Sequence, residues 1–241
     1  MEIGKVLMGA VVGVSLVAAA PRAWAVGPVT VPNFSFESPE VNNPFNATAT
    51  LDIWQKSAIP DYAEASGTFK NVDQGDPDSL PDIDNTDGIQ GAFLFSAPAN
   101  EIYQDLLATY QVGEAYQLTV GAEGGGLGMV LGEPLLMILY YRDPTIQSGD
   151  NRVPINFATI LNDNPPNQTI THLDDWSVSI PQVAANDPWA GKAIGIQFAA
   201  PLTATGGYWD LDNVRLTAFV PEPTAIGLLA FASLGLLRRR T

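Results

Sequence analysis

The chain has 241 residues, of which 46% are hydrophobic and 15% are charged, and it contains no cysteine. This composition excludes a disordered chain and a disulfide scaffold, and it predicts a protein that folds around a buried core. Eleven basic against 26 acidic residues give a formal net charge of -15. That charge excludes a general nucleic-acid binder, because each phosphate contact would meet a repelling field.

The first 25 residues predict a secretory signal peptide. Lys5 precedes an unbroken small and apolar run at 6–20, and Ala23-Trp24-Ala25 fits the A-x-A cleavage pattern. The run is shorter than the roughly 20 residues that a membrane span needs. We therefore expect signal peptidase to leave a mature chain that starts at Val26. An uncleaved membrane anchor or a core helix is the alternative.

The body, residues 26–220, predicts one all-β domain. It carries 6 basic and 24 acidic side chains, a net charge of 6 minus 24, or -18. Short apolar segments rich in Val, Ile, Phe and Tyr are separated by clusters of Gly, Pro, Asn and Asp, which is typical of strands. A helical turn is plausible only within 99–110. Strands are predicted at 31–37, 92–96, 116–123, 135–142, 176–180, 192–199 and 209–219.

Seven strands at this spacing predict an antiparallel β-sandwich. Long loops are expected at 41–50, 70–91 and 143–167. The second of these holds six aspartates between Asp73 and Asp87. Divalent cations would relieve their mutual repulsion, but the spacing does not fit an EF-hand, since Phe93 stands where the bidentate Glu belongs. A solvated acidic loop that ends in an Asp-Gly turn is the preferred interpretation.

The C-terminus changes polarity abruptly twice. Pro221-Glu222-Pro223 is followed by an uncharged, mostly apolar stretch at 224–237 and then by Arg238, Arg239 and Arg240. A helix over 225–237 would be about 20 Å long, short against a hydrocarbon core of about 30 Å. The arginines are expected to stay cytoplasmic, which leaves the body on the far side of the membrane.

This tail resembles the PEP-CTERM sorting signal of Gram-negative bacteria. The triplet, the short apolar helix and the terminal Arg cluster occur in the order of that family, over residues 221–241. The resemblance implies export, transient retention in the inner membrane and processing by an exosortase near the triplet. It also implies a place at the cell surface or in the extracellular matrix, in association with exopolysaccharide. A weak permanent anchor is the alternative.

Several short segments span nearly the whole body in order: 32–39, Trp54, Asp87-Gly88, 104–106, Gly113, 116–120 and 209–216. Together they resemble galactose-binding-like jelly rolls, related in pattern to CenC-type carbohydrate-binding modules. The resemblance implies a jelly-roll sandwich, often with a structural calcium ion that joins the first and last strands.

Glu37 and Asp212 are the natural pair for such a calcium site. Asp212 shares parity with Val214 and Leu216, so strand alternation directs its carboxylate to the core unless a bulge intervenes. A buried carboxylate needs a partner. Two carboxylates with backbone carbonyls and water can supply the six to eight oxygens that calcium prefers. Equally, each carboxylate could cap a turn or accept backbone N–H groups.

Nucleophilic catalysis has little support in the sequence. His172 is the only histidine, and neither a cysteine nor a Gly-x-Ser-x-Gly elbow occurs. A lone histidine is most often a surface or capping residue. A zinc site is disfavoured because the chain has no cysteine and no second histidine to act as further ligands. Paired carboxylates could make a glycosidase, but acids are so abundant here that a pair is expected by chance. We therefore expect no enzyme.

Four tryptophans follow the predicted cleavage site, and sugars bind by stacking on such rings. Trp189 lies in a loop-like stretch and is expected to be exposed, whereas Trp54 and Trp209 are expected in the core. Trp189, Tyr140 and Tyr141 are the candidate ligand contacts. The sequence thus predicts a surface-sorted, non-catalytic protein that associates with extracellular polysaccharide, with calcium as an optional ligand. A structural protein without sugar binding, or a secreted carbohydrate-active enzyme, is the alternative.

Overall fold

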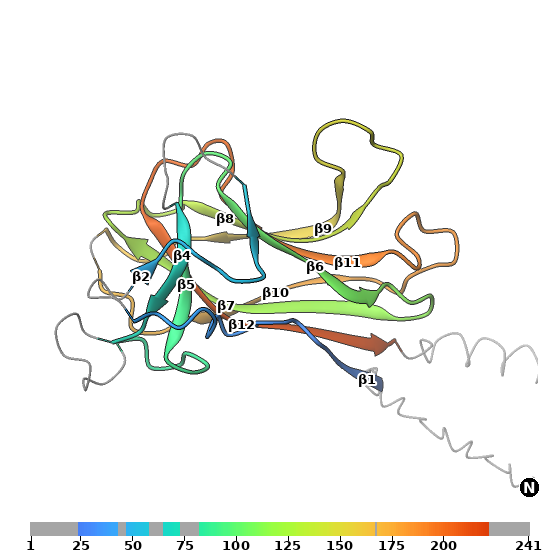
Figure 1. The fold of residues 1–241 in the computed structure, drawn as a ribbon, viewed down its shortest axis with the longest axis horizontal. Helices are drawn as coiled ribbons and strands as arrows, with labels where there is room; N and C mark the ends of the chain where they lie inside the picture. Colours follow the sequence, from blue (N-terminus) through green and yellow to red (C-terminus); the bar gives the residue numbers. More distant parts are fainter. Residues whose placement is uncertain (1–23, 43–46, 58–64, 73–81, 167, 222–241) are drawn as a thin grey trace, which may run out of the picture. The chain divides into compact units, whose positions relative to one another are not determined.

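A computed structural model describes residues 24–42, 47–57, 65–72, 82–166 and 168–221. This part of the chain contains strands and no helix, which confirms the predicted all-β jelly-roll sandwich (Figure 1). The predicted signal peptide, the apolar C-terminal helix and the Arg cluster lie outside the described residues, as do Asp73, Asp76 and Asp78. The strands are β1 Trp24–Val29, β2 Ala47–Thr48, β3 Gln55–Lys56, β4 Ser66–Lys70, β5 Gln90–Phe95, β6 Glu101–Thr109, β7 Ala115–Gly126, β8 Pro134–Arg142, β9 Arg152–Leu161, β10 Asp174–Ile180, β11 Ala193–Ala199 and β12 Tyr208–Val220.

Two antiparallel sheets form the sandwich. In the first, the strand order is β10-β7-β12-β5-β4-β2, and β1 pairs with the far end of β12. In the second, the order is β3-β6-β11-β8-β9. We refer to them as sheet A and sheet B. Every pairing is antiparallel, so the strands can alternate between a core face and an outer face.

The core lies between the inner faces of the two sheets. Leu118 and Val120 of β7 and Ile194 and Ile196 of β11 are among its fully buried side chains. Trp54 and Trp209 are both buried, as expected. The Trp54 ring lies 5.3 Å from that of Phe36 and 6.0 Å from that of Phe198, and its indole N–H donates to the Asn33 carbonyl. This ring therefore joins the first turn of the body to sheet B.

The two outer faces differ. A smaller apolar cluster, Ile83, Ile170 and Leu173, packs with Phe69 and Tyr208. Ile83 lies in the segment before β5, and Ile170 and Leu173 lie in the segment before β10. Because Phe69 belongs to β4 and Tyr208 to β12, the cluster lies on the outside of sheet A. Side chains on the outside of sheet B remain partly exposed. Sheet B thus presents the more accessible face.

Six of the seven predicted strands are confirmed, but the strand predicted at 31–37, the helical turn thought plausible within 99–110 and the loop expected at 143–167 are wrong. Residues 31–37 form turns and no strand, because Asn33 and Phe36 have positive φ angles of 49° and 54° that break extended backbone. Residues 99–110 contain β6 and no helical turn, since Ile102, Gln104 and Leu106 are buried with a period of two. The predicted loop at 143–167 contains all of β9.

The two ends of the body lie side by side. β1 is antiparallel to β12, with Trp24 opposite Val220 and Val29 opposite Leu216 (Figure 1). Residues 24–221 form one compact unit. The predicted cleavage before Val26 would remove the first two residues of β1. Among the described residues, no helix has the length and apolarity needed to cross a membrane.

Candidate functional site

The outer face of sheet B gathers charged and aromatic side chains. Alternation along β6 directs Glu101, Tyr103 and Asp105 to this face, while the residues between them are buried. Asp105 stands opposite Gly195 of β11, and Gly195 stands opposite Tyr140 of β8. These three residues therefore form one row across three strands. We call this outer surface of sheet B the open face.

Gly195 makes room for the Tyr140 ring. A Cβ at position 195 would lie 2.2 Å from Cε2 of Tyr140, so the ring lies flat against the glycine backbone. The Tyr140 hydroxyl donates to Oδ1 of Asp105 at 2.9 Å. Arg142 donates to both oxygens of the same carboxylate, through Nε at 3.0 and 2.9 Å and Nη2 at 2.9 Å. Burial, followed by the Asp105 charge, raises the pKa of Tyr140, which keeps its phenol protonated.

The guanidinium group of Arg152 on β9 lies over the rings of Tyr103 and Tyr140. Its guanidinium carbon lies 3.9 Å above the centroid of Tyr103 and 5.8 Å from that of Tyr140, within cation–π range. It forms ion pairs with Glu101 and Asp150. Its Nη1 atom is buried and has no hydrogen-bond acceptor in the described part of the chain. The open face thus holds a rigid charge network with a spare donor.

Beside this network the open face is apolar. The register places Gln197 opposite Ile138, and Ile138 opposite Phe157 of β9. Phe157 is 58% exposed, and Leu161 further along β9 is also exposed. An exposed aromatic ring therefore lies on the same surface as the Asp105–Arg142 pair. Such a combination suits a ligand with apolar C–H faces and polar hydroxyls.

The three predicted ligand contacts are separated by the structure. Tyr140 is on the open face, although its ring is buried beneath the charge network. Tyr141 points the opposite way, as alternation requires, and belongs to the core cluster. Trp189 is half-buried rather than exposed, since its ring packs 6.5 Å from that of Tyr141 and its indole N–H is buried. Phe157 is the exposed aromatic that sequence reasoning missed.

Glu37 and Asp212 meet at the loop before β5. Oε1 of Glu37 accepts the N–H groups of Ile89 at 2.9 Å and Gln90 at 2.8 Å. Oδ2 of Asp212 accepts the N–H of Asp87 at 2.5 Å. The sequence left open whether these carboxylates cap turns or hold an ion. Each does accept backbone N–H groups, and both act on the same loop.

Asp212 lies on the outer side of sheet A and not in the core between the sheets. The register slips between Asp212 and Arg215, and Asn213 adopts a φ of 53°. Because of this bulge, Leu211 and Val214 both point into the core, and Asp212 between them points to the outer face of sheet A. The side chain is nevertheless fully buried, and its Oδ1 has no hydrogen-bond donor among the described residues.

Burial raises the pKa of Asp212 to about 7, and the neighbouring carboxylates of Asp87 and Glu37 add to the rise. An orphaned carboxylate oxygen beside two other acids suits a cation. In the described part of the chain, no three acidic or histidine side chains form a metal-binding group. A calcium ion at Glu37 and Asp212 would therefore need backbone carbonyls and water as its other ligands.

A second carboxyl pair lies nearby on the outside of sheet A. Asp210 of β12 stands directly opposite Glu123 of β7, and both side chains are buried. Burial raises the pKa of Asp210 to about 8, and burial and Asp163 raise that of Glu123 to about 7. Oε1 of Glu123 accepts Nδ2 of Asn164 at 2.9 Å. Sequence reasoning missed this pair because its signal, two acids in apolar strands, needs the strand register.

His172 pairs with an aspartate at the surface of the protein. Its Nδ1 lies 2.7 Å from Oδ1 of Asp84, and both side chains are well exposed. Hydrogen bonding to Asp84 raises the pKa of His172. Asn85 on the same loop donates to the carbonyl of Leu173 and accepts its N–H. The histidine therefore helps to fasten the loop before β5 to the segment before β10.

Comparisons with known proteins show the fold. No protein-family model matches the chain, and no curated protein matches it. A cyclase from Fischerella sp. TAU is 19% identical, with a TM-score of 0.59, and the match covers 81% of this chain and 98% of the cyclase. A Stig cyclase from the same organism, in complex with an indole compound, is 18% identical at the same TM-score and covers 82% of this chain and 98% of its own.

A CBM4 structure is also similar, at 17% identity with a TM-score of 0.42, covering 80% of this chain and 100% of that one. At these identities the likeness to the cyclases establishes a shared sandwich fold and no shared activity. The looser CBM4 match carries no argument. Function must therefore be argued from the residues of the open face and of the two carboxylate sites.

Proposed function

We propose that this protein is an exported, non-catalytic surface protein that binds extracellular polysaccharide through the open face of sheet B. The observation that carries the proposal is the exposed ring of Phe157 on the same face of sheet B as the Asp105–Arg142 pair and Gln197. Pyranose rings present C–H faces that pack on aromatic and aliphatic side chains, and hydroxyls that bond carboxylates and guanidinium groups. The open face offers both kinds of contact on rigid strands.

The ends of the chain support a surface location. Residues 1–25 are proposed to direct export, and Pro221-Glu222-Pro223 with Arg238, Arg239 and Arg240 to direct exosortase processing after transient retention in the inner membrane. The body would then stay at the cell surface or in the matrix. Its net charge of -18 favours a neutral or cation-bridged polymer over a polyanion.

Calcium is proposed as a structural ligand of Glu37 and Asp212. The ion would relieve the burial of the orphaned Asp212 oxygen and would tie β12 to the turns that precede β5. It would lie on the outside of sheet A, whereas the open face belongs to sheet B. Calcium would therefore support polysaccharide binding through the stability of the sandwich and not by touching the polymer.

Retention of residues 24–221 on immobilised exopolysaccharide tests the proposal. Phe157→Ala should lower retention about fivefold or more, because stacking and apolar contact by one ring contribute roughly 1 kcal/mol or more. The matched control is Phe34→Ala, which removes another exposed phenylalanine from a turn outside sheet B. Equal retention of wild type and Phe157→Ala would show that the polymer binds elsewhere and would refute the assignment of the open face. No retention of either protein would leave a purely structural surface protein.

A secreted carbohydrate-active enzyme is the second candidate. The observation in its favour is the opposed pair Asp210 and Glu123, since carboxyls that titrate near neutrality can act as general acids. Release of reducing ends from a panel of glycans tests it, with Asp210→Asn and Glu123→Gln as variants. Turnover that either substitution abolishes would replace the non-catalytic proposal.

A further inference from the structure

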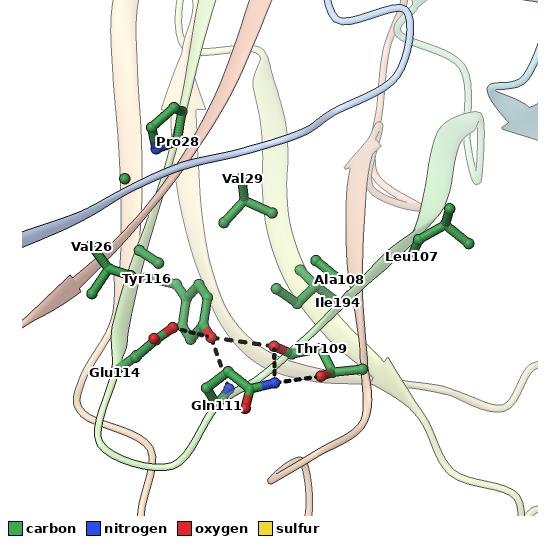
Figure 2. A pocket seen from close by; sticks show the side chains of 12 residues that line it. Val26, Pro28, Val29, Leu107, Ala108, Thr109, Gln111, Glu114, Tyr116 and Ile194 are labelled. Atoms are coloured by element: carbon green, nitrogen blue, oxygen red, sulfur yellow. Dashed lines mark hydrogen bonds between the residues drawn. The ribbon is translucent and has the colours of Figure 1, made fainter.

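Both ends of the body lie beside one pocket. This terminal pocket has a volume of about 350 Å³ and is lined by β1 from Val26 to Val29, by the end of β6, by the start of β7, and by Ile194 and Ala218 (Figure 2). Trp24 is paired with Val220 next to it. The terminal pocket is distinct from the open face and from both carboxylate sites.

Apolar side chains form the walls and surround the mouth. Val29, Ala108, Ile194 and Ala218 line the inside. At the rim, Leu107 is 101% exposed and Val26 is 56% exposed. A fully exposed leucine next to an apolar pocket is unfavourable in water, and such surfaces mark contacts with apolar partners.

One charge lies at the mouth of the terminal pocket. Oε2 of Glu114 accepts the Tyr116 hydroxyl at 2.9 Å, and that hydroxyl accepts the N–H of Gln111 at 2.8 Å (Figure 2). None of the residues that line the pocket is basic. The fixed carboxylate therefore favours a ligand that combines an apolar tail with a cationic head.

The sequence on either side of the body indicates where such a ligand comes from. Apolar runs at 6–20 and 225–237 start four positions outside Trp24 and Pro221. Four extended residues reach at most about 14 Å. If the run at 225–237 enters the membrane as proposed above, the terminal pocket is tethered within that distance of the lipid head groups.

We infer that the terminal pocket takes the acyl chain of a membrane phospholipid, with the ammonium of a zwitterionic head group beside Glu114. The inference rests on the proposed export topology. Before processing, this contact would hold the end of the sandwich against the membrane and would keep the chain near Pro221 at the surface. The C-terminal processing site would thereby be presented in one orientation.

Vesicle flotation of residues 24–221 tests the inference, since this segment is one compact unit that contains every described strand. The body should float with vesicles of phosphatidylcholine and phosphatidylethanolamine. Replacing the ethanolamine lipid with anionic phosphatidylglycerol should weaken flotation. Leu107→Asp should reduce flotation about tenfold or more, because it replaces a leucine that lipid would bury with a charged side chain.

The matched control is Leu202→Asp. Leu202 is also strongly exposed, at 80%, but it lies in the loop between β11 and β12, three residues beyond Ala199, which stands opposite Glu101 at the far end of β6. Its substitution should leave flotation unchanged. Equal losses in both variants, stronger binding to anionic vesicles, or no flotation would overturn the inference. A lipid-free dimer that Leu107→Asp dissociates would assign the surface to a second copy instead and would also overturn it.

Polysaccharide retention separates this inference from the proposed function. Leu107→Asp should still bind the polymer, because Leu107 lines the terminal pocket and Phe157 lies at the other edge of sheet B. A body that floats but binds no polymer would support the lipid site and contradict the proposed function.

Discussion

The titration of Asp212 has the most specific consequence for stability. The folded protein raises its pKa from 3.8 to about 7 because the carboxyl is buried and one of its oxygens has no donor. A raised carboxyl pKa means that the folded state favours the protonated form. The contribution of Asp212 to the free energy of unfolding is therefore fully present below about pH 4 and is lost as the pH rises to about 7. At roughly 1.4 kcal/mol per pH unit, the loss is about 4 kcal/mol.

Asp212→Asn tests this value. The amide keeps an oxygen that can accept the Asp87 N–H but does not ionise. In chelator, urea unfolding should show the wild type losing stability between about pH 4 and 8, and the variant losing up to about 4 kcal/mol less over that range. Asp210 and Glu123 also have raised pKa values and remain in both proteins, so the difference between the two curves isolates Asp212.

Calcium provides the second half of the test. At pH 8 the ion should raise the melting temperature of the wild type with concentration, because it binds the folded state, and it should not shift Asp212→Asn. Stability that rises with pH in chelator would refute the buried carboxylate. A calcium response that survives in Asp212→Asn would place the ion elsewhere.

Three further substitutions probe the packing. Gly88→Ala puts a Cβ 2.3 Å from Oε1 of Glu37 at a φ of 108°, so circular dichroism melts should show lower stability and a weakened calcium response. Gly195→Ala would displace the Tyr140 ring, so we expect the free energy of unfolding in urea to fall by about 1–3 kcal/mol and polysaccharide retention to weaken. Unchanged retention would contradict the assignment of the open face. Trp54→Ala should cost about 3–5 kcal/mol by chemical denaturation, and a cost below 1 kcal/mol would show that this ring is not needed in the core.

Sequence reasoning located strands where apolar residues are dense. β5, β7, β8, β10, β11 and β12 all overlap predicted segments. It missed β9, because most of that strand is exposed and polar residues interrupt its apolar pattern. It predicted no strand at 99–110, where it held a helical turn plausible, although the buried residues of β6 recur with a period of two. Local composition is informative for strands buried on both faces and less so for strands with one exposed face.

Some residues of the candidate sites could be identified from the sequence and others could not. Glu37 and Asp212 could be paired from the sequence because each lies in a short motif, and the structure brings both to the loop before β5. Asp210 and Glu123 could not, since only the register of β12 on β7 makes them neighbours. Phe157 gave no signal because its exposure depends on which face of sheet B it occupies.

The sequence by itself determined the acidic charge of the body, the all-β fold class and the polarity changes at both ends. These properties depend on composition and on the local order of residues, so they do not require the tertiary arrangement. Only the tertiary structure decided that the bulge at Asn213 turns Asp212 away from the core, that Tyr140 and Tyr141 point to opposite faces, and that the two ends of the body, Trp24 and Val220, lie together beside the terminal pocket. Each of these depends on strand register, and a shift of one residue reverses every side chain along a strand.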